Sequence, residues 1–395
     1  MVDLNKFKYY NIKVKKWVLF LRLVVKGENM LVSCQGLELS DALLRVSKAI
    51  SSKITNPILE GIKMVAEDDT LTLSATDTEL SIEKKIKANV KSEGETVVPG
   101  RFITEFVKKL TNSTIELEVN EKNQLAIRYD DSESIIQCYN PVEYPGFKKI
   151  DTTDYFGMSK KDFKSCVLKT IFAVALDDSR PILKGVLFDI SSGCVNVVAL
   201  DGYRLARVKK NVTSNVEKSI VVPSRSLAEL SKLIDDTDDI INVYIDKYAI
   251  MVDLGDTKVT SRLLEGDYIN YKQIIPVNYE SFITVNKANF EEALERATLL
   301  SKTSGNNYVK FDIKENNILL TSNSELGNLK ENIPVNLSGK DIIISFNPRY
   351  FLESLKAVSN DFVKLCFINS STPCVVVPTE EDEFLYLILP VRVIG

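Results

Sequence analysis

A repeat with a constant spacing limits what this chain can fold into. NPILEGIKMVA in the first half returns as RPILKGVLFDI, and Pro181 minus Pro57 and Asp201 minus Asp77 each give 124 residues. A unit of this length is too long for a solenoid repeat and long enough for a domain with its own core. We therefore expect the 395-residue chain to be a series of similar domains.

A third copy is less similar in sequence but keeps the 124-residue spacing. One arginine, one glutamate and one lysine recur three times at this distance: Arg101, Glu105 and Lys108; Arg225, Glu229 and Lys232; Arg349, Glu353 and Lys356. A single trio is typical of a solvated helix face with i,i+4 pairing, whereas threefold recurrence favours a shared role. We predict an N-terminal extension outside the fold, 1–29, and three domains at 30–150, 151–278 and 279–395.

Each repeat predicts two amphipathic helices among antiparallel strands, which is an α+β fold. The six helices are expected at 39–53, 99–110, 159–170, 223–234, 286–302 and 347–358. In the first, Ser40 is expected to be the N-cap. In the second, we expect Phe102, Phe106 and Leu110 to form the buried stripe.

The net charge of −4 hides a segregation of charge. The six predicted helices contain 17 Lys and Arg against 8 Asp and Glu, or +9, so the remaining residues carry −13. If the helices faced a common space, it could hold a phosphate backbone without reading bases. The alternative is six ordinary amphipathic helices whose lysines reach out to solvent.

The sequence argues against most enzyme classes. It contains no histidine, which removes the usual general base, the commonest zinc ligand and every Ser-His-Asp arrangement. Six cysteines without a CxxC pair suit neither a zinc site nor a disulfide framework, and we expect reduced, buried thiols. We predict no catalytic residue, metal or cofactor. A carboxylate enzyme using Asp77 and Asp201 remains an alternative, although their matching places favour a role in turns.

Membrane insertion has little support in the sequence. The nearest apolar run, 17–25, is short and contains Arg22, whereas a membrane helix needs about 20 apolar residues. The most distinctive hairpin is 195–208, where Asp201-Gly202 joins two alternating runs, a strong signal for a two-residue turn.

From Met30 to Gly395 the chain resembles the bacterial beta sliding clamps, the beta subunit of DNA polymerase III. The resemblance is carried by MLVSCQGLELSDALLRVSKAI, the pair NPILEGI and RPILKGV, VVALDGYRLA, TSRLLEGDYINYKQIIP and FLYLILPVRV. It implies three clamp domains per subunit, each with two helices on antiparallel sheets, and a head-to-tail homodimeric ring. Helices would line a hole around duplex DNA, and the ring would tether a polymerase without catalysing a reaction.

The resemblance also implies functional residues. The helix-borne DNA-facing candidates, with Lys53 in a loop, are Arg45, Lys48, Lys53, Arg101, Lys108, Lys169, Arg225, Lys232, Arg296, Arg349 and Lys356. The implied peptide pocket comprises Leu183, Leu200, Gly202, Tyr203, Arg204, Leu205, Pro276, Leu387, Leu389, Pro390, Val391 and Arg392. Leu299 and Leu300 are candidates for the subunit contact. Tyr203 stands where histidine is common in the family, and Leu200 where a small or hydroxylated residue is common, which puts partner affinity in question.

The implied partners are double-stranded DNA, a second copy of the chain, the replicative polymerase, the clamp-loader ATPase and repair proteins, the last three through short linear motifs. A cytoplasmic, nucleoid-associated protein with no membrane partner is expected. The competing hypothesis is a monomeric three-domain adaptor that binds peptides but does not encircle DNA.

Overall fold

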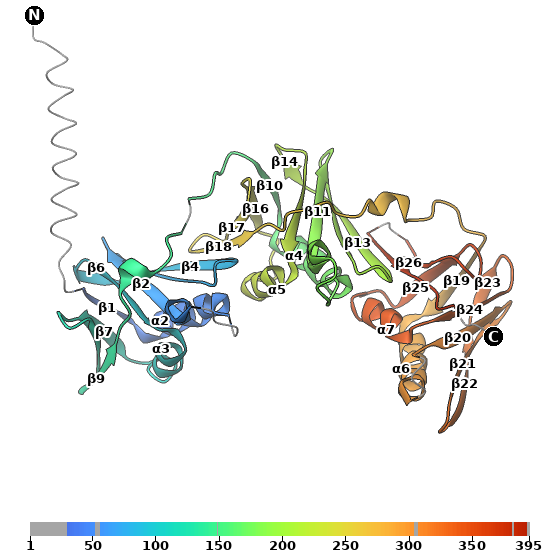
Figure 1. Ribbon diagram of the computed structural model, residues 1–395, viewed down its shortest axis with the longest axis horizontal. Helices are drawn as coiled ribbons and strands as arrows, with labels where there is room; N and C mark the ends of the chain where they lie inside the picture. Colours follow the sequence, from blue (N-terminus) through green and yellow to red (C-terminus); the bar gives the residue numbers. More distant parts are fainter. Residues whose placement is uncertain (1–29, 52–55, 148, 304–306, 381–382, 393–395) are drawn as a thin grey trace, which may run out of the picture. The chain divides into compact units, whose positions relative to one another are not determined.

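The computed structural model describes residues 30–51, 56–147, 149–303, 307–380 and 383–392 (Figure 1). The predicted extension and Lys53 lie outside these residues. The chain divides into two compact units, which we call the first unit (1–149 with 251–260) and the second unit (150–250 with 261–395). The predicted domain boundaries are not tested by this division and stay a prediction.

Within its described residues, the first unit contains two α-helices and two groups of paired strands. One sheet has the order β5 (Asn89–Ser92), β1 (Leu31–Gln35), β7 (Thr114–Val119), β8 (Gln124–Tyr129) and β9 (Ser132–Gln137). The other group has the order β18 (Thr257–Arg262), β4 (Leu80–Lys87), β3 (Thr70–Thr76), β2 (Gly61–Glu67) and β6 (Gly94–Pro99). Helices α2 (Gly36–Val46) and α3 (Gly100–Val107) pack against each other.

The described part of the second unit holds four α-helices: α4 (Lys160–Leu168), α5 (Ser224–Leu233), α6 (Lys287–Thr303) and α7 (Pro348–Lys356). Helix α4 packs on α5, and α6 packs on α7. Its smaller groups of strands are β14 (Thr213–Ser214), β10 (Tyr155–Ser159) and β16 (Ile240–Ile245), and β22 (Gly327–Pro334), β21 (Asn317–Ser324), β20 (Val309–Lys314) and β24 (Ile342–Phe346).

A nine-stranded antiparallel sheet in the second unit joins the second and third repeats. Its order is β15 (Lys218–Pro223), β11 (Gly185–Ser191), β12 (Cys194–Leu200), β13 (Arg204–Asn211), β27 (Phe384–Ile388), β26 (Cys374–Pro378), β25 (Phe362–Phe367), β19 (Ser281–Asn286) and β23 (Asn336–Ser338). The joint is the β13–β27 pair, in which Leu205 lies opposite Leu387. The end of the chain is therefore hydrogen-bonded to the predicted hairpin.

A helix lies at each of the six predicted places within the described residues, and the α+β class is confirmed. Most of the helices are shorter than predicted, but α2 begins earlier, at Gly36, and α6 extends to Thr303. The expected N-cap of the first helix is wrong, because α2 begins at Gly36 and Ser40 lies buried inside it. Strand β1 leads directly into the helix, since the Gly36 N–H donates to Ser113 O at 2.9 Å. Only glycine fits here, as a Cβ would lie 2.0 Å from Leu110 O.

The buried stripe of α3 also differs from the prediction. Ile103 and Val107 are buried, whereas Phe102 is 50% exposed and stacks on Phe106 with 5.7 Å between ring centroids. Gly100 sets this orientation, because its backbone approaches the core so closely that a Cβ would lie 2.6 Å from the Glu60 carbonyl oxygen. The helix therefore turns positions 100, 103 and 107 inward.

The six cysteines are free thiols, five of them buried and Cys194 partly exposed. In the described parts of the chain, no helix has the length and apolar character needed to cross a membrane.

Candidate functional site

The hairpin between β12 and β13 turns at an aspartate that holds the backbone. Asp201 Oδ1 accepts the N–H groups of Tyr203 at 2.9 Å and Arg204 at 3.0 Å, and Gly202 has a φ of +91°. In the first repeat, Asp77 Oδ1 accepts the N–H groups at the matching positions, at 3.1 and 2.9 Å. Both carboxylates thus serve as turn caps, which the shared position in the repeat predicted and which gives no support to acid–base catalysis.

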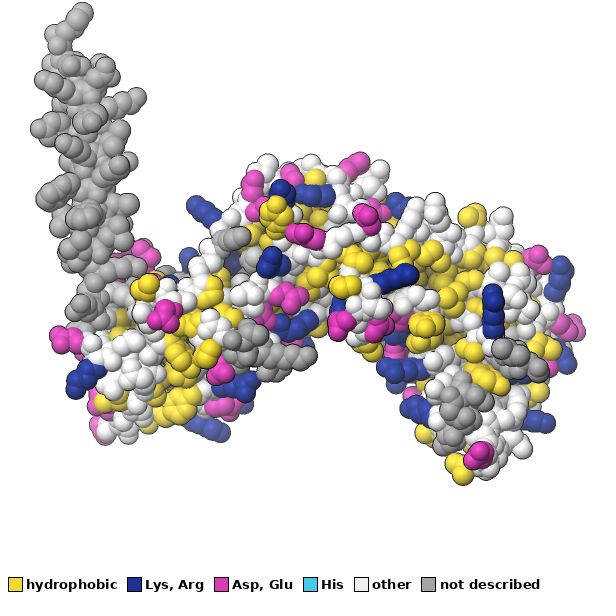
Figure 2. All heavy atoms as spheres, in the orientation of Figure 1, with side chains coloured by type: hydrophobic (Ala, Val, Ile, Leu, Met, Phe, Trp, Pro, Cys, Tyr) yellow, Lys and Arg dark blue, Asp and Glu magenta, His cyan; other side chains and the backbone are white. Residues whose placement is uncertain are grey.

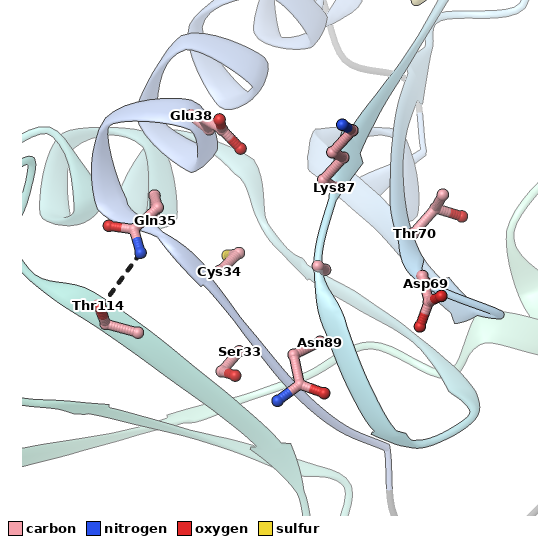
Figure 3. A pocket seen from close by; sticks show the side chains of 10 residues that line it. Ser33, Cys34, Gln35, Glu38, Asp69, Thr70, Lys87, Asn89 and Thr114 are labelled. Atoms are coloured by element: carbon pink, nitrogen blue, oxygen red, sulfur yellow. Dashed lines mark hydrogen bonds between the residues drawn. The ribbon is translucent and has the colours of Figure 1, made fainter.

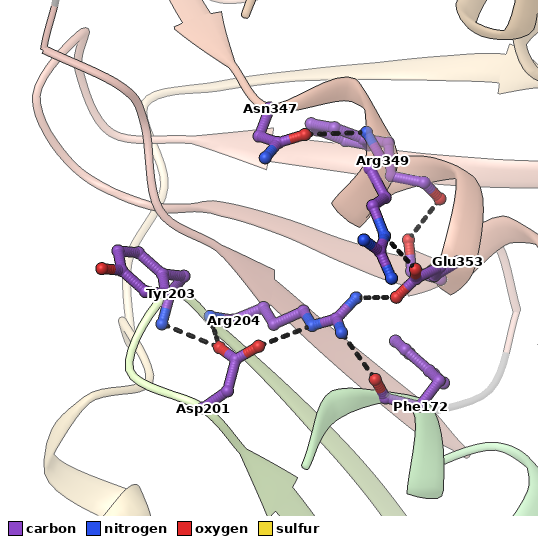
Figure 4. A network of polar contacts seen from close by, with 9 residues as sticks. Phe172, Asp201, Tyr203, Arg204, Asn347, Arg349 and Glu353 are labelled. Carbon is purple, nitrogen blue, oxygen red and sulfur yellow. Dashed lines mark hydrogen bonds and ion pairs between the residues drawn. The ribbon is translucent and has the colours of Figure 1, made fainter. Parts of the chain in front are cut away.

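Arg204 is buried, at 7% exposure, and its guanidinium is fully engaged (Figure 4). Nε donates to Asp201 Oδ2 at 3.0 Å, one terminal nitrogen donates to Glu353 on α7, and the other donates to Phe172 O at 2.6 Å. The guanidinium carbon also lies 4.8 Å from the ring centroid of Tyr350. Arg204 therefore ties the hairpin to the helix of the third repeat instead of projecting into solvent.

Glu353 binds a second arginine with its other oxygen. Arg349, one turn earlier on α7 and exposed, donates from Nε to Glu353 Oε1 at 2.6 Å. Burial opposes ionisation of Glu353, but the bonds from Arg349 and Arg204 outweigh it and hold the pKa of its carboxyl below the ordinary value. The carboxylate is therefore ionised at neutral pH.

Tyr203 is the exposed tip of this hairpin, at 61% exposure. Its ring stacks on Tyr350 of α7, with centroids 6.2 Å apart and an angle of 20° between the ring planes. Its carbonyl oxygen accepts the N–H of Leu389 at 2.9 Å, so the segment after β27 is fastened to the turn.

Below the hairpin, four of the predicted pocket residues lie in one hydrophobic cluster. Leu183, Leu200, Leu205 and Leu387 are all buried there, and Leu389 packs against them. Pro276, Pro390 and Val391 are half-buried, and Gly202 and Arg392 are exposed. Figure 2 shows hydrophobic side chains gathered on the face of the second unit that it presents, beside scattered lysines and arginines.

Sequence reasoning missed most of one side of this cluster. The connecting segment 264–279 contributes Leu264, Tyr268, Ile269, Tyr271, Ile275 and Tyr279. Two of its hydroxyls fix it to the sheet: Tyr271 donates to Asp189 at 2.7 Å, and Tyr268 donates to Val198 O at 3.3 Å. The density of Tyr and Ile in GDYINYKQII, residues 266–275, could have indicated this, but only the following Pro276 was selected.

The predicted DNA-facing residues differ in how exposed they are and in the carboxylates that they contact. Exposed candidates on the helices are Arg101, Lys108, Arg225, Lys232, Arg349 and Lys356. Arg45 and Lys48 are half-buried, and Arg45 donates to Asp41 at 2.8 Å. The side chain of Lys169 is only 12% exposed and lies 3.0 Å from Glu383. Arg296 is exposed but forms a bidentate bond with Glu331.

A cavity of about 840 Å³ opens on the helical side of the second unit, between α4 and α7. Its acidic residues Glu383 and Asp162 are each paired with Lys210 at 3.0 Å. Lys161, Lys164 and Lys356 also line it, beside Glu353. The cavity is continuous with the Arg204 network, because Phe172 and Glu353 belong to both.

The first unit has a separate cavity of about 770 Å³ where β1 leads into α2 (Figure 3). Gln35, Glu38, Lys87 and Asn89 line it, together with the buried Cys34. Burial raises the pKa of the Cys34 thiol to about 12, so the thiol is protonated and unreactive at neutral pH. No group of three or more potential metal ligands occurs among the residues that the structure describes.

The candidate subunit-contact residues lie on α6. Leu299 is 71% exposed and Leu300 is half-buried. Two edge strands are further candidates for a subunit contact. Strand β9 is at the edge of the five-stranded sheet of the first unit, and β22 is at the edge of the four-stranded group of the second. Ile135 on β9 is also exposed.

Comparison with protein families covers all three repeats. Models of the DNA polymerase III beta subunit match residues 30–148 as the N-terminal domain, 157–270 as the central domain and 272–392 as the C-terminal domain. The chain belongs to the beta sliding clamp family. The fold of three clamp domains and the resemblance inferred from the sequence are thereby confirmed.

Individual beta sliding clamps are similar over nearly the whole chain. The "Beta sliding clamp" of Staphylococcus epidermidis is 34% identical over 366 residues, covering 90% of this chain and 96% of the relative. The "Beta sliding clamp" of Staphylococcus aureus is 34% identical over 368 residues with the same coverage. The crystal structure of the DNA polymerase sliding clamp from Bacillus subtilis has a TM-score of 0.90 at 31% identity, covering 93% of this chain and 100% of that one.

Proposed function

We propose that this chain is a DNA sliding clamp, a non-catalytic processivity factor that encircles duplex DNA as a head-to-tail homodimer. It tethers the replicative polymerase, the clamp loader and repair proteins through short peptides that bind at the β12–β13 hairpin. The observation that carries the proposal is the succession of three clamp domains, matched over 30–148, 157–270 and 272–392. A nucleoid-associated, cytoplasmic location is part of the same proposal.

The helix surfaces support the nucleic-acid partner. The arginine and lysine of each recurring trio are exposed, so every repeat offers cations to phosphate oxygens. Such contacts position a duplex without reading its sequence and release counterions. We therefore expect sequence-independent binding that weakens steeply with salt. Lys169 and Arg296 are the weakest candidates, because Lys169 is largely buried beside Glu383 and Arg296 is held by two bonds to Glu331.

The hairpin supports the peptide partner. An exposed aromatic residue, Tyr203, stands beside a buried leucine cluster that is built from two repeats. The connecting segment adds two further exposed apolar residues, Ile274 and Val277. Apolar anchors next to a few fixed polar groups are typical of surfaces that bind short linear motifs.

The sheet edges support the dimer. Strands β9 and β22 each leave one side of a sheet unpaired within the described chain, and unpaired edges are templates for pairing with another chain. In a head-to-tail dimer, β9 of one copy would meet β22 of the other, with Leu299 alongside.

Light scattering separates this proposal from the monomeric adaptor. The clamp is expected to have twice the 44.4 kDa chain mass at micromolar concentration and to bind short duplexes in low salt. A stable monomer that binds polymerase peptide but no duplex would favour the adaptor instead.

A further inference from the structure

Glu353 belongs to neither predicted site, yet it is bonded to a residue of each. Its Oε1 accepts from Arg349, an exposed residue of the proposed DNA-facing helix α7. Its Oε2 accepts from Arg204, which is buried under the proposed peptide-binding hairpin (Figure 4). One carboxylate thus connects a cation on the helix surface with a cation beneath the hairpin.

Arg204 acts on the peptide surface through the hairpin and not by direct contact. All three guanidinium nitrogens already donate to acceptors within the chain. Its backbone N–H is held by Asp201, and its neighbours Tyr203 and Leu205 form the exposed tip and the buried cluster. Arg204 is therefore a positioning residue, and Glu353 determines how firmly it is held.

The matching positions in the other two repeats make different contacts in the described chain. In the second trio, Glu229 accepts instead from Lys232 on its own helix, at 2.8 Å. In the first repeat, the position of Arg204 is taken by Leu80, which is fully buried and carries no charge. Neither arrangement could transmit a change from a helix surface to a hairpin.

We propose that Glu353 couples the two sites, so that a duplex phosphate bound to Arg349 raises peptide affinity at the hairpin. The inference rests on the proposed function, because both ligands come from it. When Arg349 turns to a phosphate, the carboxylate keeps Arg204 as its sole partner, and a charge-assisted bond in a largely buried site strengthens. A more firmly held hairpin loses less freedom when peptide binds. By reciprocity, bound peptide raises affinity for duplex by the same factor.

The test measures peptide affinity of the full-length protein by fluorescence anisotropy, with and without a short linear duplex in low salt. The probe is a fluorescein-labelled peptide with the clamp-binding sequence of the same organism's replicative polymerase. We expect the duplex to tighten peptide binding about fivefold, at the lower end of usual coupling between sites.

Three variants locate the coupling. Arg349→Ala should bind peptide more tightly than the wild type without DNA and should not respond to duplex, because Glu353 already has Arg204 alone. Glu353→Gln should bind peptide more weakly and should also not respond. The matched control is Arg225→Ala, which removes the equivalent exposed arginine of the second trio. It should weaken duplex binding as Arg349→Ala does, but at saturating duplex it should still show the tighter peptide binding.

The outcomes distinguish the inference from the function on which it rests. A wild type that binds both ligands without mutual effect overturns the coupling alone, and so does an equal response in Arg349→Ala and Arg225→Ala. A wild type that binds neither ligand overturns the proposed function together with the coupling. Should Glu353→Gln fail to fold, Arg349→Ala decides the question, since Arg349 is exposed and its loss leaves the packing unchanged.

Discussion

The aspartate turns of the first and second repeats have nearly the same backbone and different surroundings. Asp77 and Asp201 cap their turns with the same pair of N–H bonds. After the cap, the first copy buries Leu80, whereas the second buries Arg204 with three polar partners. The turn therefore belongs to the repeated fold, and the side chains that follow it distinguish the second copy, where we propose the peptide site.

Each hairpin is also tied to the repeat that follows it by a buried cation. In the first unit, Lys84 on β4 donates to Asp256 at 2.6 Å, and β4 pairs with β18. In the second unit, Arg204 on β13 donates to Glu353, and β13 pairs with β27. The lysine donates to Asp256 and lies 4.0 Å from a second carboxylate, Asp41 Oδ2. The arginine instead joins a hairpin, a helix and the Phe172 carbonyl. The Arg204–Glu353 joint is thus better suited to transmit a change at the surface of α7 to the hairpin.

The largest expected effect comes from removing the C-terminal segment that is hydrogen-bonded to the Asp201 turn of the second repeat. Deleting Leu389 to Gly395 removes the N–H that donates to Tyr203 O and the N–H of Val391 that donates to Ser345 O. We expect peptide binding to be lost and the dimer mass to be unchanged, measured by anisotropy and light scattering. Normal peptide binding by the truncated protein would show that the site has been misplaced.

Replacing Arg204 by the leucine found at the matching position of the first repeat should lower the free energy of unfolding. Arg204→Leu reproduces Leu80 but leaves Glu353 and Asp201 without their buried partner, and breaking such a pair costs about 3 to 5 kcal/mol. Urea unfolding should show this loss in the transition that exposes the second unit, and a second substitution, Glu353→Leu, should recover part of it. A cost below about 1 kcal/mol, the usual value for exposed pairs, would mean that the network is not desolvated.

The two aspartates should respond differently to the same substitution. Asparagine keeps an oxygen for the turn but loses the charge that Asp201 Oδ2 offers to Arg204. Asp201→Asn should therefore destabilise the protein by about 1 to 3 kcal/mol, whereas Asp77→Asn should cost less. Thermal unfolding of both variants checks the difference, and equal costs would contradict the comparison.

The smallest effect is the part of the pH dependence of stability that Glu353 contributes. Because the pKa of folded Glu353 lies below the ordinary value of a glutamate, its contribution to stability is present above that ordinary value. It is lost as pH falls through the lowered pKa, where the folded carboxylate takes up a proton. In urea titrations at different pH values, Glu353→Gln should weaken the fall of the unfolding free energy at acid pH. An unchanged fall would mean that other carboxylates cause the pH dependence.

The sequence predicted the local parts of this site and missed the distant ones. The Asp201 turn could be recognised because an aspartate and a glycine at adjacent positions determine its geometry. The bond between Arg204 and Glu353 joins residues 149 apart, and no spacing rule pairs them. The buried face of α3 was mispredicted for a related reason: it depends on how closely Gly100 approaches Glu60, which hydrophobic periodicity does not report.

Which residues contact DNA is the part that sequence could predict least. Lys169 has the same helical pattern as the exposed candidates. However, its ammonium donates to Glu383, which lies more than 200 positions away in the sequence. The fold, in contrast, could be predicted because the 124-residue spacing repeats its strands and helices together.

The central claim is topological: the ring holds DNA by surrounding it. After loading by the ATP-driven clamp loader onto a nicked circular duplex, the protein is expected to stay bound through gel filtration in moderate salt. Cutting the circle once should release it, because the ring slides off the new ends. Equal retention on the intact and the cut circle would contradict encirclement and leave only an ordinary DNA-binding protein.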